Sequence, residues 1–189
     1  MTGELQQGEF YRGAASIARL WPDIPFPAGW KANIRGTDLN LQYPAGWQRA
    51  KEIKYAQGIR GPAPAGYVGT APLAAPESRV LYDYTLAAAP RLTLSYHTRG
   101  EEIYWRYGEC EPENAKQIGE LFARLSGYKL ADPVPESANA GYKDWFIEAF
   151  DRPGYTVEVG LGTNPLPLSD FDGIFEKNLP ILVYDALVT

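Results

Sequence analysis

The stretch that decides the fold class is Arg91-Leu92-Thr93-Leu94-Ser95-Tyr96-His97. Its apolar residues Leu92, Leu94 and Tyr96 alternate with polar ones, which is the period-two pattern of a β-strand. The stretch ends at His97, and a Thr-Arg-Gly turn follows it. We therefore predict a strand over residues 91–97 that carries an imidazole at its end.

The segments that follow this strand alternate between extended and helical patterns. We predict helices over residues 76–86, 113–125 and 170–188, and further strands over residues 102–107 and 155–159. The last helical segment is expected to break at Pro180, because proline lacks the backbone donor of a helix interior. Alternation of strands and helices of this length predicts an α/β fold with an at least partly parallel sheet.

The first 75 residues are rich in glycine and proline. A helical turn at residues 15–21 and a short helix at residues 47–57 are expected within otherwise irregular chain. A long structureless stretch is uncommon in a compact domain and is usually functional, so we predict that residues 30–75 help to form a site. No internal repeat or linker divides the sequence, which predicts a single domain over residues 1–189.

Composition excludes several classes of protein. The 189 residues carry 18 basic and 23 acidic side chains, for a net charge of −5, without the basic run that a general nucleic-acid binder needs. His97 and Cys110 are the only residues of their types, which rules out an internal disulfide and a Cys/His zinc cluster. Neither a membrane span of about 20 apolar residues nor a signal peptide is visible. We expect a soluble chain that is not addressed for export, with no nucleic-acid or membrane partner.

Two polar residues are prominent because each belongs to an otherwise apolar strand. His97 ends one strand, and Glu158 lies in the strand over residues 155–159, where a carboxylate is costly unless it is paired or functional. In open α/β sheets, ligands collect where strands end. These residues are therefore candidates for chemistry. The alternatives are a satisfied, partly buried histidine and a solvent-facing glutamate.

Two further segments combine charged and aromatic residues. Residues 30–40 hold Lys31 and Arg35 beside amides and a tryptophan, a set of donors that suits an anionic substrate group. The alternative is a solvated loop held by Asn/Asp turns. Residues 141–145 form a similar piece, whose alternative is a turn that opens a helix. The motifs GxGxxG, GxxxxGK[ST] and GxSxG do not occur, so nucleotide chemistry and serine hydrolysis lack support.

Four segments in sequence order resemble a known family: residues 30–47, 95–105, 141–147 and 154–167. They are similar to the zinc carboxypeptidases of the carboxypeptidase A superfamily, peptidase family M14, and in particular to the bacterial γ-D-glutamyl-diaminopimelate peptidases. The likeness covers residues 30–189 and leaves an irregular N-terminal segment over residues 1–29. It implies a three-layer α/β/α sandwich with a mixed sheet, present as a partial carboxypeptidase-like domain.

The resemblance assigns roles to four charged or ligating residues. It implies that His97 is the third zinc ligand and that Glu158 is the catalytic base that activates the zinc-bound water. Lys31 stands where the family has an arginine that supports the oxyanion, which keeps the charge and loses the bidentate fork. Arg35 could contribute to that role instead.

The same comparison implies how a substrate is held. Asn40 matches the asparagine that binds the substrate carboxylate, although Leu41 replaces the arginine that usually follows. Lys143 lies where the family sets side-chain specificity, and a cation there suits an acidic, diaminopimelate-type side chain. The expected substrate is therefore a peptide with acidic groups, specifically the γ-D-glutamyl-diaminopimelate bond of peptidoglycan stem peptides.

One family motif does not occur in the sequence. The first two zinc ligands come from a His-x-x-Glu motif, whereas His97 is the only histidine. The resemblance thus implies zinc with one ligand visible, and a C-terminal half that is active only with a complementing N-terminal half. The alternative is a catalytically inactive peptide-binding module or a truncated fragment. An incomplete sheet would also expose a strand edge, from which we expect self-association.

Overall fold

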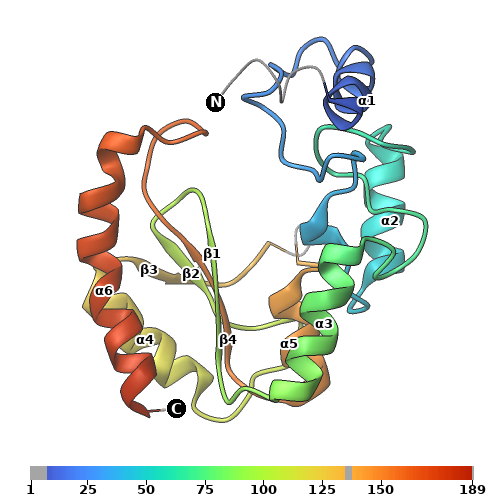
Figure 1. Cartoon of the computed structure of the whole chain (residues 1–189). Helices are drawn as coiled ribbons and strands as arrows, with labels where there is room; N and C mark the ends of the chain where they lie inside the picture. Colours follow the sequence, from blue (N-terminus) through green and yellow to red (C-terminus); the bar gives the residue numbers. More distant parts are fainter. Residues whose placement is uncertain (1–7, 135–137, 189) are drawn as a thin grey trace. The chain divides into compact units, whose positions relative to one another are not determined.

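The computed structural model describes residues 8–134 and 138–188 (Figure 1). The chain separates into two compact units. The first unit holds the chain up to Ala87 together with Asn139–Gly141, and the second holds Ala88–Ala138 and the chain from Tyr142 onward. Each unit has its own buried apolar cluster. The single domain expected over residues 1–189 stays a prediction.

The first unit consists of helices joined by long loops. Its elements are α1 (Glu9–Ala18), the 3-10 helix η2 (Leu39–Leu41), α2 (Trp47–Ala56) and α3 (Pro76–Ala88). The short helix expected at residues 47–57 and the helix that begins at Pro76 are confirmed. The helical turn expected at residues 15–21 is wrong in position, because α1 starts earlier and ends at Ala18. The first seven residues of the predicted irregular segment lie outside the described residues.

One buried side chain organises the loops of the first unit. Gln42 is fully buried, donates from Nε2 to the carbonyl of Val68, and accepts at Oε1 from the backbone N–H of Ala75 at 2.8 Å. Trp47 donates to the same Val68 carbonyl at 3.1 Å. Because a buried amide must be hydrogen-bonded to be tolerated, Gln42 fixes two loop segments that sequence patterns leave undefined.

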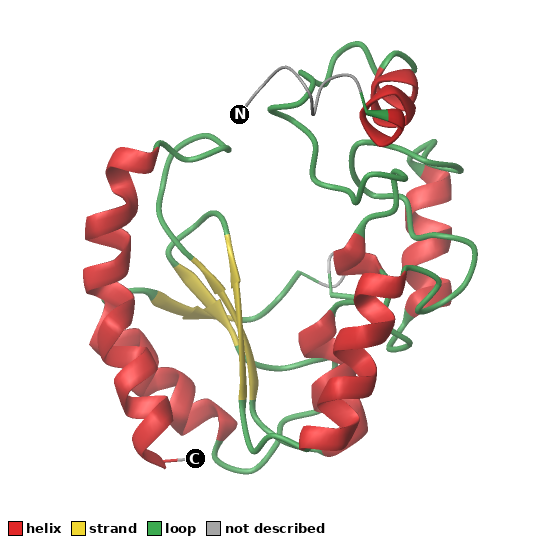
Figure 2. Cartoon of the chain, viewed as in Figure 1, coloured by secondary structure: helices red, strands yellow, loops and turns green. Residues whose placement is uncertain are grey.

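The second unit is built on a mixed four-stranded sheet (Figure 2). Its order is β1-β4-β2-β3, with parallel pairs β1·β4 and β2·β3 and an antiparallel pair β2·β4. The strands are β1 (Thr93–His97), β2 (Glu102–Tyr104), β3 (Lys129–Ala131) and β4 (Gly154–Glu158). The predicted α/β class with a partly parallel sheet is confirmed. Strand β3 was not predicted, because its three residues are too few to show an alternation of polar and apolar side chains.

Helices cover both faces of this sheet. They are α4 (Ala115–Ser126), α5 (Tyr142–Phe150) and α6 (Phe171–Val188), which the 3-10 helix η3 (Leu168–Asp170) precedes. On one face, the Tyr155 hydroxyl donates to the Ala115 carbonyl at 2.6 Å, and the Tyr155 ring packs edge-on against Phe122 at 5.1 Å. This face therefore joins α4 and α6 to the sheet in the main core of the unit.

The opposite face packs against α5. A β-carbon at Gly154 would lie 3.2 Å from Phe146 and 3.3 Å from Ile147, so glycine lets the helix approach the strand closely. Because side chains alternate along a strand, Gly154 shares its face with Thr156 and Glu158. The second unit thus has the three-layer arrangement that the resemblance implied (Figure 1).

Helix α6 corrects one expectation. It runs unbroken from Phe171 to Val188, with Pro180 in its interior, so the predicted break at Pro180 is wrong. Proline removes one helical hydrogen bond, but Ile181 is fully buried beside it, and Asn178 donates to the Ile174 carbonyl and the Tyr128 hydroxyl. Tertiary packing on both sides of the proline holds the helix together.

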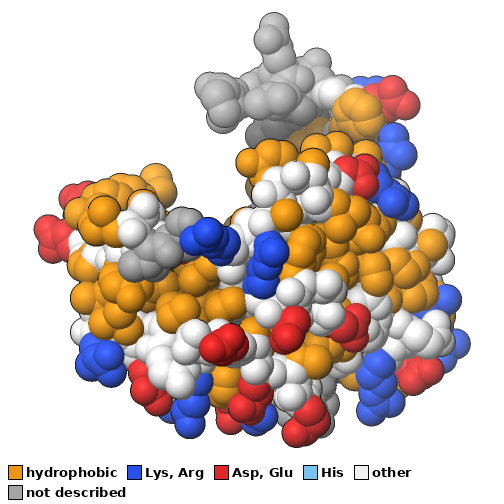
Figure 3. Space-filling view, turned by 90° about the horizontal axis from the view of Figure 1, so that it is seen from below, with side chains coloured by type: hydrophobic (Ala, Val, Ile, Leu, Met, Phe, Trp, Pro, Cys, Tyr) orange, Lys and Arg blue, Asp and Glu red, His pale blue; other side chains and the backbone are white. Residues whose placement is uncertain are grey.

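The surface combines charged residues with many exposed apolar side chains (Figure 3). Among the described side chains of α6, large apolar residues that are at least 40% exposed include Phe171, Phe175, Leu179, Leu182, Val183 and Leu187. Such an exposed apolar stripe on a helix is typical of a surface that another element covers. Among the described residues, no helix is long and apolar enough to cross a membrane.

Strand β1 leaves one edge of the sheet open. It pairs with β4 on one side, and the described part of the chain has no further strand beside its other edge. Open strand edges template pairing between molecules. We therefore expect self-association that increases with concentration in size-exclusion chromatography with light scattering. Tyr96→Lys on β1 should shift the population towards monomer, because charge on an edge strand opposes pairing.

The control is Tyr84→Lys on α3, a tyrosine that is 68% exposed and lies outside the sheet. It should leave the association curve unchanged. A monomer at all concentrations, or equal effects of the two variants, would contradict association through the β1 edge.

Candidate functional site

The register of the sheet places four polar residues in one row. His97 on β1 is the partner of Glu158 on β4, Glu158 is the partner of Glu102 on β2, and Glu102 is the partner of Lys129 on β3. Direct partners in a sheet point to the same face. The row therefore places an imidazole, two carboxylates and an ammonium side by side on one face of the sheet. Helix α5 covers the same face near Gly154, at the start of β4.

The neighbouring rows show that this polarity belongs to one face only. The next row, on the other face, is apolar or aromatic and consists of Tyr96, Val157, Ile103 and Leu130. The row after it returns to the face of His97 and is mainly polar, with Ser95, Thr156, Tyr104 and Ala131. One face of the sheet thus packs the core, while the other brings polar groups to the carboxyl ends of β1 and β4.

The pKa of Tyr104 reflects the negative charge of this face. Its hydroxyl donates to Oε2 of Glu102 at 2.9 Å. Burial, this hydrogen bond and the charges of Glu102 and Glu158 together raise the pKa of Tyr104 to about 12. The phenol therefore stays protonated at neutral pH and acts as a hydrogen-bond donor to the carboxylate.

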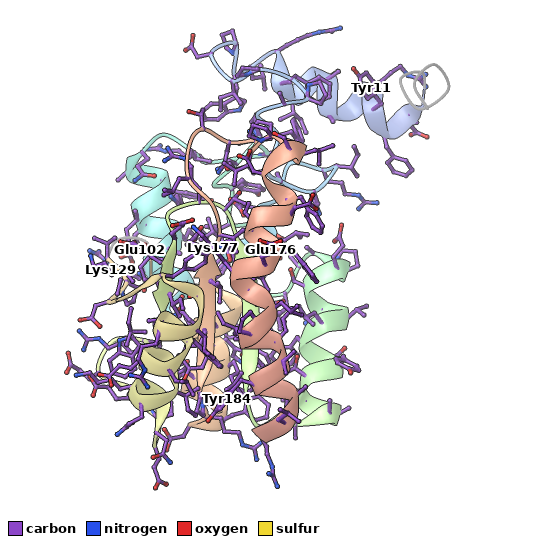
Figure 4. All side chains as sticks on the ribbon, turned by 90° about the vertical axis from the view of Figure 1, so that its left-hand side faces the viewer. Tyr11, Glu102, Lys129, Glu176, Lys177 and Tyr184 are labelled. Carbon is purple, nitrogen blue, oxygen red and sulfur yellow. The ribbon has the colours of Figure 1, made fainter. Side chains whose placement is uncertain are left out.

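Lys129 offsets part of the negative charge. Its Nζ lies 3.6 Å from Oε1 of Glu102, and Figure 4 shows the two labelled residues beside each other. Lys129 is 74% exposed, so this ion pair contributes little to stability. The row remains acidic between His97 and the sheet edge, and such a surface favours a cation.

The loops that follow the two candidate residues are tied together. The N–H of Val159 donates to the carbonyl of His97 at 2.8 Å, and the N–H of Gly100 donates to the carbonyl of Gly160 at 2.9 Å. Gly160 has φ +70, and a β-carbon there would come within 2.6 Å of Leu166. The chain therefore needs glycine to turn away after Glu158.

Lys143, the predicted specificity residue, lies in the first turn of α5 and is buried. Its Nζ is 2.7 Å from Oδ1 of Asp144 and donates to the carbonyl of Arg106 at 2.7 Å. The lysine and aspartate side chains are only 6% and 5% exposed. A buried charge of this kind is tolerated only because it is paired. Residues 141–145 do open a helix, as the alternative interpretation held.

The three other predicted site residues lie in the first unit. Lys31, Arg35 and Asn40 are all exposed, and none of their side chains forms an ion pair or hydrogen bond with another described residue. Asn33 and Asp38, in contrast, hold the loop: Asn33 Oδ1 accepts from the backbone N–H groups of residues 35 and 37, and Asp38 accepts from those of residues 40 and 66. The turn chemistry therefore presents three side chains to solvent.

The structure thus brings together only some of the predicted residues. His97 and Glu158 are cross-strand partners, Lys143 belongs to the same unit, and the other three residues lie in the first unit, with Lys31 and Arg35 in a loop and Asn40 in η2. Sequence reasoning missed Glu102 and Tyr104. Their only signal in the sequence was the pattern Glu102-Ile103-Tyr104, in which an apolar residue separates two polar ones.

The residues present meet only part of the needs of a metal ion. Catalytic zinc keeps three protein ligands and one open position. The chain over residues 8–134 and 138–188 has no group of three His, Cys, Asp or Glu side chains that could hold a metal. His97 can supply one imidazole nitrogen at the acidic row. The described residues therefore do not complete a zinc site by themselves.

Comparisons with known proteins agree with the resemblance seen in the sequence. The family model described as zinc carboxypeptidase, peptidase M14, matches residues 19–180. A γ-D-glutamyl-L-diamino acid endopeptidase of Lysinibacillus sphaericus is 46% identical over 158 residues, which are 82% of this chain and 38% of that protein. The uncharacterised protein YqgT of Bacillus subtilis is 40% identical over 153 residues, which are 81% of this chain and 40% of that protein.

A solved structure shows the same fold. Bovine thrombin-activatable fibrinolysis inhibitor, in complex with a tick carboxypeptidase inhibitor, matches with a TM-score of 0.60 and 19% identity, over 82% of this chain and 57% of that one. The chain spans about two fifths of the length of the two sequence relatives.

The buried Lys143–Asp144 pair gives a stability prediction. Asp144→Asn should lower the free energy of unfolding by roughly 3–5 kcal/mol, because it leaves a buried ammonium without its anion. A double variant, Lys143→Met with Asp144→Asn, should recover part of this loss. Urea denaturation of the full chain measures both effects.

The exposed Arg49–Glu52 pair is the matched control, since its side chains are 67% and 55% exposed. Glu52→Gln should cost no more than about 1 kcal/mol. If Asp144→Asn costs no more than Glu52→Gln, the buried pair has no special role in stability.

Proposed function

The chain belongs to the zinc carboxypeptidase family, peptidase M14, and from that premise we propose that it forms part of a metallopeptidase that cleaves γ-D-glutamyl-diamino acid bonds in peptidoglycan stem peptides. The observation that carries this proposal is the direct pairing of His97 with Glu158 at the carboxyl ends of two parallel strands. The 46% identity to a γ-D-glutamyl-L-diamino acid endopeptidase supports the substrate class.

In this proposal, Glu158 is the general base and then the general acid. It takes a proton from the attacking water and delivers it to the leaving amine, which is ordinary work for a carboxylate within hydrogen-bond reach of both groups. His97 supplies one metal ligand. Zinc, when bound, would lower the pKa of that water and polarise the scissile carbonyl. The two remaining ligands would come from a His-x-x-Glu motif, which this sequence lacks.

Residues of the first unit are proposed to hold the substrate's anionic groups. Asn40 would bind a substrate carboxylate, and Lys31 or Arg35 would stabilise the oxyanion. The three side chains are exposed, so they can bind a ligand without first breaking an internal ion pair. A lysine at the oxyanion position would act as a point charge rather than as a bidentate fork.

A second candidate function is a peptide-binding module that does not cleave its ligand. The observation that favours it is the lack of a three-ligand metal group among the described residues. In that case Asn40, Arg35 and Lys143 would bind acidic peptides, and Glu158 would have no proton to transfer. Metal-dependent hydrolysis separates the two functions.

The test of the main proposal is complementation. The chain alone should bind zinc weakly and should not hydrolyse a γ-D-glutamyl-diaminopimelate peptide. Addition of a separately expressed segment that carries His-x-x-Glu should produce stoichiometric zinc binding, measured by metal analysis after dialysis, and peptide cleavage, measured by chromatography. In this pair, Glu158→Gln should keep the zinc and reduce kcat by at least about 10²-fold, because it removes the base.

The matched control is Glu176→Gln on the exposed surface of α6 (Figure 4), which should leave zinc and kcat unchanged. Full activity of Glu158→Gln would remove Glu158 from the catalytic role. Stoichiometric zinc and cleavage by the 189-residue chain alone would show that other residues build the metal site.

Lys143 is proposed to set specificity for an acidic side chain. An ammonium has three donors, and the contacts with Asp144 and the Arg106 carbonyl use two of them. In the complemented enzyme, Lys143→Met should raise KM for a diaminopimelate peptide about tenfold, the range of one charge-assisted hydrogen bond. The KM for the matching lysine peptide, which lacks that carboxylate, should change little. Equal effects on both peptides would assign Lys143 a purely structural role.

A further inference from the structure

We infer that Asn164 is a positioning residue for the His97–Glu158 pair and that it acts through the carbonyl group of Thr98. Asn164 lies in the loop that follows β4. Thr98 directly follows His97, which is the last residue of the neighbouring strand β1. The Nδ2 group of Asn164 donates to the Thr98 carbonyl oxygen at 3.1 Å. The side chain thus joins the two segments that leave the candidate catalytic strands.

This hydrogen bond completes a short series. The first two connections are between backbone groups, from Val159 to His97 and from Gly100 to Gly160. They extend the pairing of β1 and β4 by a few residues and end where the chain turns at Gly160. The Asn164 amide adds the third connection from beyond that turn. It therefore fixes the path of the chain immediately after His97 in a way that strand pairing alone does not.

The surroundings of Asn164 indicate that it is not placed for stability alone. Its side chain is partly buried, whereas its neighbours Thr163 and Pro165 are exposed. Its Oδ1 atom is buried and has no hydrogen-bond partner among the described residues. An unsatisfied buried acceptor is costly. The Asn164 side chain thus leaves its acceptor unsatisfied while its donor bonds to the segment after His97. This arrangement is consistent with a role in holding that segment.

The other end of the same turn is held from α6. Lys177 Nζ contacts Oε1 of Glu101 at 2.5 Å, and Figure 4 shows Lys177 on α6. The turn at residues 98–101 is thus anchored at Thr98 by Asn164 and at Glu101 by Lys177. With both anchors in place, the backbone leaves His97 in one direction, and the imidazole keeps its position in the row beside Glu158.

The test uses the fact that His97 is the only histidine of the chain. Its ring gives a single pair of imidazole signals in a ¹H–¹³C spectrum of the full chain, recorded at one fixed pH. Asn164→Asp is nearly isosteric and replaces the donor with an acceptor. We expect it to shift or split the His97 ring signals, to weaken the nuclear Overhauser effect between His97 and Glu158, and to speed amide exchange of Gly100 by about tenfold or more.

Three further variants make the test decisive. Asn164→Gln keeps a donor and should restore the His97 signals in part, whereas Asn164→Ala should resemble Asn164→Asp and serves if that variant does not fold. Thr163→Ala, in the same loop, should match the unchanged chain. The inference is overturned if the folded Asn164 variants leave the His97 signals and Gly100 exchange unchanged, or if Thr163→Ala has the same effect. The inference rests on the proposed roles of His97 and Glu158, but these readouts need no catalysis, so its failure is distinct from failure of the proposed function.

Discussion

The parallel pairing of β1 with β4, in which His97 lies opposite Glu158, is the interaction on which the candidate site depends. A shift of one residue in this register would move every side chain of one strand to the other face of the sheet. The imidazole and the carboxylate would then lie on opposite faces. The fully buried Tyr155 and Val157 fix the register, because they belong in the core with α4 and α6.

The two faces of the sheet therefore differ in character. The face towards α4 and α6 supplies burial, through residues such as Ile103, Phe122 and Ile181. The face towards α5 carries the candidate site, since the register places polar side chains on this face of all four strands. On this face Glu102 and Tyr104, both on β2, place a second carboxylate and a protonated phenol on one side of the candidate base. The core and the candidate site thus use the same strands but different side chains.

The polar row on β1, β4, β2 and β3 supplies only part of what the proposed metal site needs. One imidazole and neighbouring carboxylates suit a bound cation, but a catalytic zinc needs a fuller set of ligands. The chain spans about two fifths of the length of its sequence relatives. The open edge of β1 and the exposed apolar side chains of α6 are both surfaces that another element could cover.

Local patterns determined much of this protein. The alternation around Leu94 and the apolar run around Val157 predicted the two strands of the candidate site, and the helix predicted over residues 113–125 is α4. The types of side chain at residues 97 and 158 made them candidates for chemistry, and the family resemblance supplied the roles that we propose for them. Each of these signals is contained within a few neighbouring residues, and at that range propensity and periodicity are informative.

Only the tertiary structure decided which distant residues meet. Glu102 is the partner of Glu158 because β2 runs antiparallel beside β4, and Lys143 can be buried because Asp144 pairs with its charge and a carbonyl group accepts its hydrogen bond. Helix α6 continues through Pro180 because the core holds Ile181. Each outcome depends on packing between segments far apart in the chain. A sequence pattern reports the preference of a residue for a local conformation, whereas register, burial and pairing are set by the free energy of the whole unit.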